Sequence, residues 1–477
     1  MKRTVCRQMF LKRRQRRLTS CGAPLRIKGI VVANDHHLPS KSAVCRPSVR
    51  RAMYAIKPWG KACHVGLSVG TLTLGIGMRW RETITEMVDS RRDPTFEMSQ
   101  HQRCVLSEHH VRLLQDVGVT RSILLQALRP ARRWRFLTPD LEVMKEGEAY
   151  TGCSPSEPVY HVSRGRLLQV LRREYQRFGG TISWDTQAIE PTPGQEATGL
   201  WSLKKDWGSG VELECIVTSD PLFESARRII LQPEHLHRGP LAGDQNSVEL
   251  ARGAYRGAIE PLDVMFDQHS VDYVMILGRG YVVHAWRSEK DHNGESITSW
   301  TMVSTQGTDD AKSDAVTDPT APSRPISATK GGAGFADLHP ALLSMMSKGR
   351  TTHDTHWLPS TCPALVPLTS GHGCPGCDTA RVVLTEDALL TVDPFDWRGD
   401  QCSTAIEEAA DLLQRFYKKK FHRGFVPLAG REFHEEALKR RWALCQRDGR
   451  DAANFLSVFA PLPKGTDTTT RLAGAAA

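Results

Sequence analysis

The 477-residue sequence lacks several features that would decide its class at once. No run of 18 apolar residues occurs, so we expect no integral membrane segment. The Gly-x-x-x-x-Gly-Lys-Ser/Thr loop of phosphate-binding ATPases is absent as well. The twelve cysteines are scattered along a long chain, which favours thiols in a reducing compartment over a disulfide framework. The length predicts two or three domains with a large core.

Acidic residues are absent from the first 34 positions, which carry ten Lys or Arg. The rest of the chain holds 53 basic and 53 acidic residues, so the net charge of +10 comes from this leader. A basic, acid-free leader over 1–26 resembles a mitochondrial transit peptide; a disordered tail or a mispredicted start are the alternatives. Phe10 is its single aromatic residue, which offers little for stacking on bases. We therefore expect no nucleic-acid partner, and a mitochondrial or otherwise cytoplasmic location.

A glycine fingerprint is missing after the first apolar segment, 27–33, which predicts a buried strand. In a dinucleotide-binding fold, Gly-x-Gly-x-x-Gly should follow, and here Ala33, Asp35 and Leu38 stand in the three glycine places. The acid expected about twenty residues later, for a ribose, is missing too, because no Asp or Glu occurs at 36–81. The glycines at 66, 70, 75 and 77 favour a tight strand-turn-strand.

The most informative stretch lies at 381–409. Val382 and Val383 predict a strand, which is followed by Asp387, Pro394 and Gly399 and then by a helix. Ser403 or Thr404 is the expected N-cap, which would place Glu407 and Glu408 in the first turn, where the helix dipole favours acids. A strand, an acidic loop and a helix N-terminus together suit a polar ligand.

This stretch resembles the second flavin-binding motif of the FAD-dependent aromatic-hydroxylase-type monooxygenases, the group of salicylate, p-hydroxybenzoate and ubiquinone-biosynthesis hydroxylases. The residues that fall on the motif at its spacing are Asp387, Ala388, Pro394, Gly399, Glu408 and Ala409. The sequence departs from the motif at Glu386 and Trp397, where the family has glycine, and at Leu390, where it has histidine.

Two further segments resemble the same family in the same order. The segment 105–119 has apolar residues at helical spacing and ends at Gly118, like a family helix that closes with Leu-Gly-Leu. The segment 160–171 resembles a His-Arg-x-x-Leu helix start, in which Arg164 matches an arginine that lies near the flavin. From the residues alone, Ser163 should cap this helix, and its leucines should form the buried face.

The segment 212–221 predicts a strand and a turn, and it resembles a family motif that contacts FAD and NAD(P)H. Asp220 matches the acid of that motif, whereas Thr218 and Pro221 replace glycines. Proline can neither donate a backbone N–H nor adopt the positive φ that glycine allows.

From residue 250 the apolar pattern has a period of two, which predicts antiparallel strands near 255–257, 273–277, 281–286 and 297–303. This order fits the family's substrate-side sheet. Residues 304–334 have a low-complexity composition typical of a disordered loop. The predicted domain parts are 27–248 and 371–460 for a cofactor domain and 249–370 for the sheet, with a disordered tail at 461–477.

A rival chemistry comes from Cys374 and Cys377, a Cys-x-x-Cys pair with His372 beside it. A structural zinc site would need a second close pair of ligands, which the sequence does not offer. A loop with two free thiols is the simpler interpretation, so we expect no metal.

The sequence therefore predicts an α/β fold: an FAD/NAD(P)-binding, Rossmann-like domain with an inserted antiparallel β-sheet substrate domain and C-terminal helices. The resemblance implies hydroxylation of an aromatic or similar small organic substrate with FAD, NAD(P)H and O2. The candidate cofactor-binding residues are Ala33, Asp35, Arg164, Asp220, Asp387, Pro394 and Gly399; no catalytic residue is assigned. The alternative is a non-catalytic pseudoenzyme of the same fold that serves a protein partner as a scaffold, because phosphate-contacting glycines are the ones replaced.

Overall fold

The computed structural model describes most of the chain between residues 61 and 457. The described ranges are 61–89, 102–148, 157–184, 201–203, 211–213, 215–220, 227, 230–231, 247–251, 253–259, 266, 271–290, 296–304, 339–347, 350–352, 356–359, 362–365, 382–390, 398–417 and 427–457. The chain divides into two units, Met1–Ala55 and Ile56–Ala477, and every described element belongs to the second. The predicted leader, the strand at 27–33, the pair of cysteines at 374 and 377 and the tail lie outside the described residues. The predicted loop at 304–334 lies outside them too, except for Ser304, which is the last residue of the strand Ser296–Ser304.

A five-stranded parallel sheet forms the centre of one part of this unit. Its strands, in spatial order, are β8 (Thr181–Ser183), β2 (Ile84–Val88), β1 (Lys61–Val65), β11 (Cys215–Thr218) and β19 (Val382–Leu384). Every residue of β11 and β19 is buried, as expected of parallel strands covered on both faces. The chain runs outward from β1 in both directions, which is the doubly wound, Rossmann-like order that the sequence predicted.

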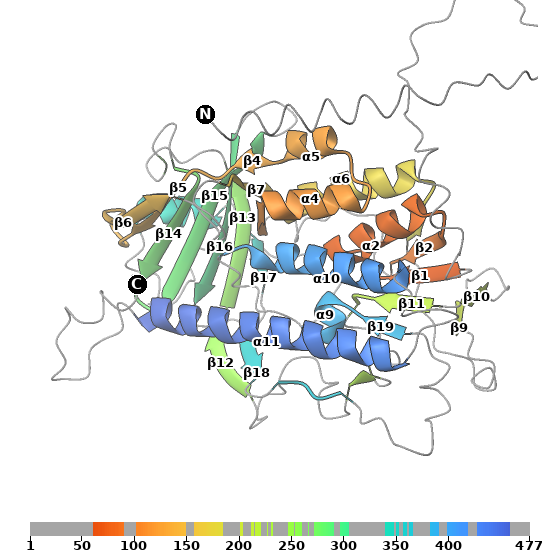
Figure 1. Ribbon diagram of the computed structural model, residues 1–477. Coiled ribbons are helices and arrows are strands. Elements are labelled where there is room, and N and C mark those ends of the chain that lie inside the picture. The colour runs from red at the N-terminus through yellow and green to blue at the C-terminus, as the bar shows by residue number, and fades with distance from the viewer. Residues whose placement is uncertain are drawn as a thin grey trace, which may run out of the picture. The chain divides into compact units, whose positions relative to one another are not determined.

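Helices cover this sheet, and α2 (Val69–Trp80) is the most deeply buried of them. It packs against α6 (Arg164–Arg177) and α10 (Asp400–Tyr417), as Figure 1 shows. The prediction of a strand-turn-strand at 66–77 is wrong, because its glycines serve close packing of this helix instead. A Cβ atom on Gly75 would collide with the Met87 side chain, and one on Gly77 would collide with Leu413.

A seven-stranded sheet forms the second part, in the order β17-β13-β16-β15-β14-β5-β6. Its strands are β5 (Arg133–Leu137), β6 (Val143–Glu148), β13 (Gly253–Ile259), β14 (Tyr273–Gly278), β15 (Tyr281–Lys290), β16 (Ser296–Ser304) and β17 (Arg350–Thr352). The predicted antiparallel strands are confirmed, since β13 pairs with β16, and β15 pairs with both β14 and β16. Strands β5 and β6 join them from 133–148, far earlier in the chain, and β5 lies parallel to β14.

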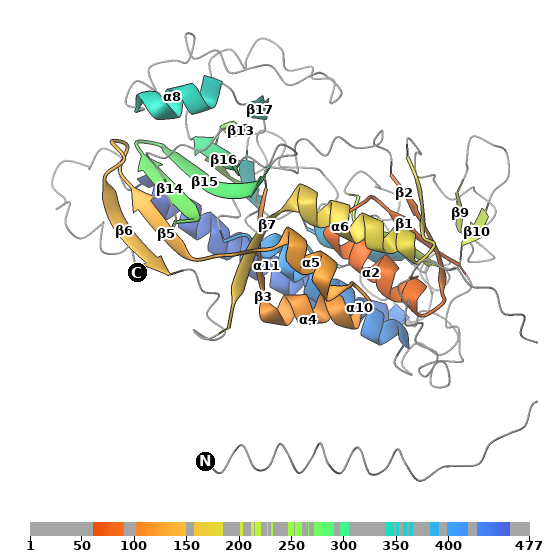
Figure 2. The ribbon, with the colours of Figure 1, turned by 90° about the horizontal axis from the view of Figure 1, so that it is seen from above.

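The period of two reflects the two covered faces of this sheet. Val274 and Ile276 pack in one cluster with Leu342 of α8 (Pro340–Ser347), whereas Tyr273 and Met275 pack in another with Phe455. Phe455 belongs to the long helix α11 (Pro427–Ser457), which also runs along β19 and α10. Figure 2 shows α8 and α11 on different sides of the strands.

The remaining elements are short. They are β3 (Arg103–Ser107), β4 (Arg129–Pro130) and β7 (Val159–Ser163) in a three-stranded sheet, β9 (Trp201–Leu203) with β10 (Val211–Leu213), β12 (Ser247–Ala251) with β18 (His356–Pro359), and the helices α4 (Glu108–Asp116), α5 (Arg121–Ala127) and α9 (Glu386–Leu389). Within the described part of the chain, no helix has both the length and the apolar character to cross a bilayer.

Several local predictions can be compared with this fold. Gly118 follows α4 at φ +113°, and Ser163 caps α6 by accepting the Arg166 N–H at 3.3 Å, so both predicted helices are confirmed. The predicted N-cap of α10 is wrong: the helix begins at Asp400, and the Ser403 hydroxyl donates to the Asp400 carbonyl at 2.8 Å. Cys104 and Cys402 form a disulfide between β3 and α10, which the scattered cysteines did not predict.

Candidate functional site

The turn that follows β1 organises the carboxyl edge of the parallel sheet. Gly66 has φ +82°, a conformation that glycine adopts without strain, and Ser68 is the N-cap of α2. Ser68 Oγ accepts the Thr71 N–H at 3.1 Å, and Thr71 Oγ1 accepts the Ser68 N–H at 2.9 Å, which makes a capping box. Gly66, Ser68 and Thr71 thus stand at the Gly-x-Gly-x-x-Gly spacing, with hydroxyl residues in the second and third places.

The sequence prediction does not include this turn, because it places the cofactor turn after the first apolar segment, 27–33. Ala33 and Asp35, assigned there to a cofactor turn, lie outside the described residues. The signals that could have found the turn are the buried strand 61–65, the glycine after it and the capping serine.

A second missed residue is Asp89, which directly follows β2. It lies 22 residues after Leu67, close to the separation at which dinucleotide-binding folds place an acid for the ribose hydroxyls. Asp89 is 2% exposed, and its Oδ2 accepts the Leu67 N–H at 2.7 Å. The sequence prediction does not include this acid, because it counts the separation from the segment 27–33 and not from β1.

Backbone hydrogen bonds hold the ends of four strands together at this edge. The Gly66 N–H donates to the Val88 carbonyl at 2.9 Å and joins β1 to β2. The Ser219 N–H donates to the Val65 carbonyl at 3.0 Å, and the Thr385 N–H donates to the end of β11 at 2.8 Å. Polar residues that follow different strands are therefore held side by side.

Two of the predicted site residues, Asp220 and Asp387, lie at this edge. Asp220 follows β11, and a Cβ atom placed on Gly66 would lie 3.1 Å from the Asp220 Cβ. Asp387 is the second residue of the short helix α9, directly after β19. Pro394 lies outside the described residues. The structure thus brings Asp220 and Asp387 to the same edge as the Gly66 turn.

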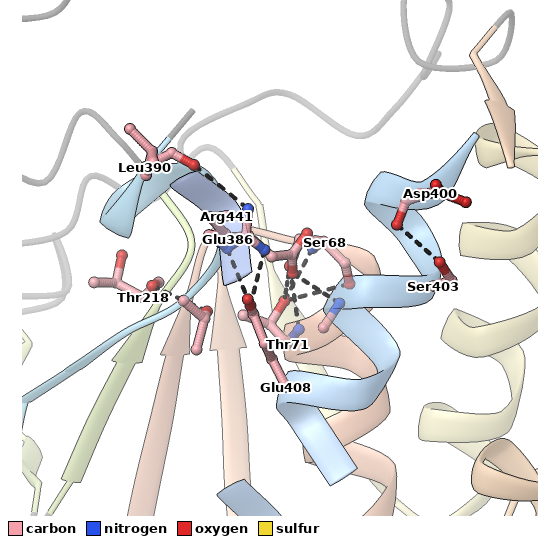
Figure 3. A network of polar contacts seen from close by, with 11 residues as sticks. Ser68, Thr71, Thr218, Glu386, Leu390, Asp400, Ser403, Glu408 and Arg441 are labelled. Carbon is pink, nitrogen blue, oxygen red and sulfur yellow. Dashed lines mark hydrogen bonds and ion pairs between the residues drawn. The ribbon is translucent and has the colours of Figure 1, made fainter. Parts of the chain in front are cut away.

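Glu386 occupies the space between this edge and the first turn of α2 (Figure 3). Its Oε1 accepts the Gly70 N–H at 2.7 Å, and it accepts a second, short hydrogen bond from the Ser68 hydroxyl. The side chain is 6% exposed, and the backbone has φ +48°, a region that residues other than glycine seldom adopt. The glycine expected from the resemblance would suit that backbone; glutamate adds a carboxylate that reaches the α2 N-terminus.

A buried ion pair lies next to Glu386. Glu408 on α10 accepts two hydrogen bonds at Oε2 from the Arg441 guanidinium of α11, at 2.8 and 3.1 Å. Burial raises the pKa of Glu408, and Arg441 opposes that rise. Burial also works to lower the pKa of Arg441, but the Glu408 and Glu386 carboxylates outweigh it and raise that pKa. The guanidinium therefore stays charged beside two acids.

Arg164 lies at the start of α6 and is linked through Gln102 to the start of α10. Its Nη1 donates to Gln102 Oε1 at 3.0 Å, and Gln102 Nε2 donates to Gln401 Oε1 at 2.7 Å. Gly399, with φ +75°, precedes α10, and a Cβ there would lie 2.9 Å from the Val105 nitrogen. Arg164 and Gly399 are thus both placed around the start of α10.

The residues 66–70 also spell Gly-x-Ser-x-Gly between a strand and a helix, the pattern of the serine nucleophile in α/β-hydrolases. That nucleophile sits on a strained turn with its hydroxyl exposed. Ser68 instead has φ −140° and ψ 174°, is 4% exposed, and engages Thr71 and Glu386. The geometry therefore assigns Ser68 to helix capping.

No protein-family model matches the sequence, and no curated protein matches it either. Solved structures do match over most of the chain. A Photorhabdus luminescens protein classed as an FAD-containing monooxygenase matches with a TM-score of 0.54 and 14% identity, covering 84% of this chain and 100% of its own. HpxO from Klebsiella pneumoniae, solved with FAD and uric acid, matches with a TM-score of 0.57 and 14% identity, covering 87% of this chain and 91% of its own.

CtdE, solved with FAD and a substrate, is similar in the same way, with a TM-score of 0.55 and 13% identity over 87% of this chain and 97% of its own. The chain has the fold of the FAD-containing monooxygenases. The predicted fold class is confirmed, and identities this low establish the fold alone.

The site fits the adenosine part of FAD better than the diphosphate at the centre of the molecule. The Gly66 turn and Asp89 suit the adenosine ribose of a dinucleotide. The diphosphate would be bound by donors at the α2 N-terminus, but Gly70 N–H and the Ser68 hydroxyl are bonded to Glu386, and Leu67 N–H to Asp89. The residues as arranged do not fit the diphosphate.

Proposed function

We propose that the chain is an FAD-dependent monooxygenase-type protein that hydroxylates an aromatic or similar small organic molecule with NAD(P)H and O2. One observation supports this proposal: polar residues that follow different strands meet at the carboxyl edge of the parallel sheet, where the strand order reverses. They are the Gly66 turn, Asp89, Asp220 and Asp387. Ligands of doubly wound folds bind at that point. The FAD of HpxO and CtdE agrees with a flavin in this fold.

In this proposal the chain's own residues position the reactants. Asp89 would hold the adenosine ribose. Asp387 would face the ribityl chain, because it follows the end of β19, which is hydrogen-bonded to the end of β11 at the same edge of the sheet. Arg164, held by Gln102, would approach the flavin ring side. FAD, when bound, would supply the chemistry that activates oxygen; the protein would supply position and exclude water.

The experiment is a titration of the purified full chain with FAD, followed by flavin fluorescence, and then a measurement of NAD(P)H oxidation with a panel of aromatic acids. Saturable binding that Asp387→Ala weakens and that Asp116→Ala leaves unchanged is the expected result. Asp116 is a matched control because it is an exposed acid on α4, at the end of another helix. Absence of saturable FAD binding at any soluble flavin concentration would contradict the proposal.

A second candidate is a non-catalytic scaffold of the same fold that acts through a protein partner. The observation that favours it is the Glu386 carboxylate on the donors that a diphosphate would use. A scaffold would show neither FAD binding nor NAD(P)H oxidation in the same assays, although the purified chain would be folded.

A further inference from the structure

We propose that the Glu386 carboxylate is a built-in competitor at the N-terminus of α2, so that a diphosphate-bearing ligand binds there only when this side chain leaves. The identity of that ligand as a dinucleotide rests on the proposed function, whereas the competition itself rests on Glu386 and α2 alone. The glutamate thereby lowers the affinity of the site for such a ligand.

The contacts of Glu386 are those of a bound anion. One carboxylate oxygen accepts both a backbone N–H of the first helical turn, from Gly70, and the N-cap hydroxyl, from Ser68. Exposed donors and the helix dipole make a helix N-terminus attractive to a phosphate, and a carboxylate satisfies the same donors. Glu386 comes from 316 residues further along the chain than Gly70, so it is a tertiary ligand of this helix rather than a local cap.

The Glu386 carboxylate also packs closely against the first turn of α2. A Cβ atom on Gly70 would collide with Glu386 Oε1, so the carboxylate already fills the space beside Gly70. The glutamate backbone has φ +48°, a conformation that glycine adopts more readily than glutamate. The carboxylate contacts therefore keep an otherwise unfavourable residue in position.

The negative charge of Glu386 also opposes the binding of a diphosphate. A diphosphate would bring negative charge against the Glu386 carboxylate, with Asp387 and Glu408 as further acids nearby. Arg441 faces these acids, but its guanidinium is already bonded to Glu408 and the Leu390 carbonyl. Like charges in a buried region repel strongly, so removal of the Glu386 charge should strengthen anion binding.

The test uses ADP, which carries the ribose and the diphosphate but no flavin, and separately FAD, in calorimetric titrations of the full chain. Glu386→Gln removes the charge and keeps the size, and Glu386→Gly restores the residue that the positive φ favours. Glu407→Gln is the matched control, because it removes a carboxylate of α10 that pairs with His110 of α4 rather than with α2. We expect both Glu386 variants to bind ADP at least tenfold more tightly than the wild type and Glu407→Gln to bind it unchanged.

The outcomes separate this inference from the proposed function. Tighter ADP binding without any FAD binding supports the competition and contradicts the flavin-dependent function. FAD binding by the wild type that neither Glu386 variant improves, with ADP binding also unchanged, overturns the competition and leaves the function standing. If circular dichroism shows that the Glu386 variants are folded and titration shows that they bind ADP no better than the wild type, the inference is overturned in every case.

Discussion

The buried pair of Glu408 and Arg441 gives the sharpest test of how this fold is held together. The two side chains are 1% and 4% exposed, and they join α10 to α11 near Glu386. Arg441 also donates to the Leu390 carbonyl at 3.4 Å. Glu408→Gln would take from the buried guanidinium the carboxylate to which it is hydrogen-bonded and leave only the more distant charges of Glu386 and Asp387. Loss of one partner of such a pair costs about 3–5 kcal/mol, so we expect a decrease of that size in the free energy of unfolding.

Urea unfolding followed by circular dichroism measures this loss, and two further variants locate its cause. The double variant Glu408→Leu with Arg441→Met should recover most of the stability, because apolar groups of similar size remove the cost of burying charge. Glu435→Gln breaks the exposed pair with Arg431 and should cost below about 0.5 kcal/mol. A loss under about 1 kcal/mol in Glu408→Gln, or a double variant no better than the single one, would refute this reasoning.

Four more predictions follow from the structure and the sequence. Burial lowers the pKa of His434 to about 3, while its Nε2 accepts the Leu384 N–H at 3.0 Å. The histidine of the unfolded state has a pKa of about 6.5 and therefore binds the proton first, so stability falls as pH drops from about 6.5 towards 3. Between pH 7 and 5 the free energy of unfolding in urea should fall by about 2 kcal/mol more in the wild type than in His434→Gln. An equal dependence on pH in the two proteins would contradict this prediction. Asp387→Ala should cost about 1–3 kcal/mol of FAD affinity in a fluorescence titration, since it removes a hydrogen bond to the ligand; unchanged affinity would argue against its assigned role. Residues 1–34 fused to a fluorescent reporter should direct it to mitochondria, and a diffuse cytosolic signal would show that the leader does not target. Deletion of 305–334 should shift the thermal midpoint little, because the segment has few apolar residues to bury, whereas loss of soluble protein would show that it packs.

The sequence by itself determined the elements whose cause is local. The period of two near 273–303 follows from strands with two different faces, and the structure has β14, β15 and β16 there. The cap at Ser163 and the helix end at Gly118 depend on single residues and their neighbours, and both are present. The colinear motifs from 105 to 409 were enough to predict the fold class, because their order follows the path of the chain.

Only the tertiary structure decided which glycine turn belongs to the central strand. The segment 61–65 is short and less apolar than 27–33, and the glycine and serine that follow it are weak signals by themselves. Its place between β2 and β11 becomes evident only when the strands pair. The role of Asp89 follows from that pairing. Strands β5 and β6 likewise join the larger sheet through contacts with residues far along the chain.

The role of Glu386 also became evident only in the tertiary structure. In the sequence it was a departure from a glycine motif, a gap in a pattern with no consequence that could be read from its neighbours. In the structure its carboxylate contacts α2, whose N-cap, Ser68, lies 318 residues earlier in the chain. It accepts hydrogen bonds from the Ser68 hydroxyl and the Gly70 N–H. Local sequence determines where a helix begins, but only the packing of distant segments determines which group satisfies its unpaired N–H donors.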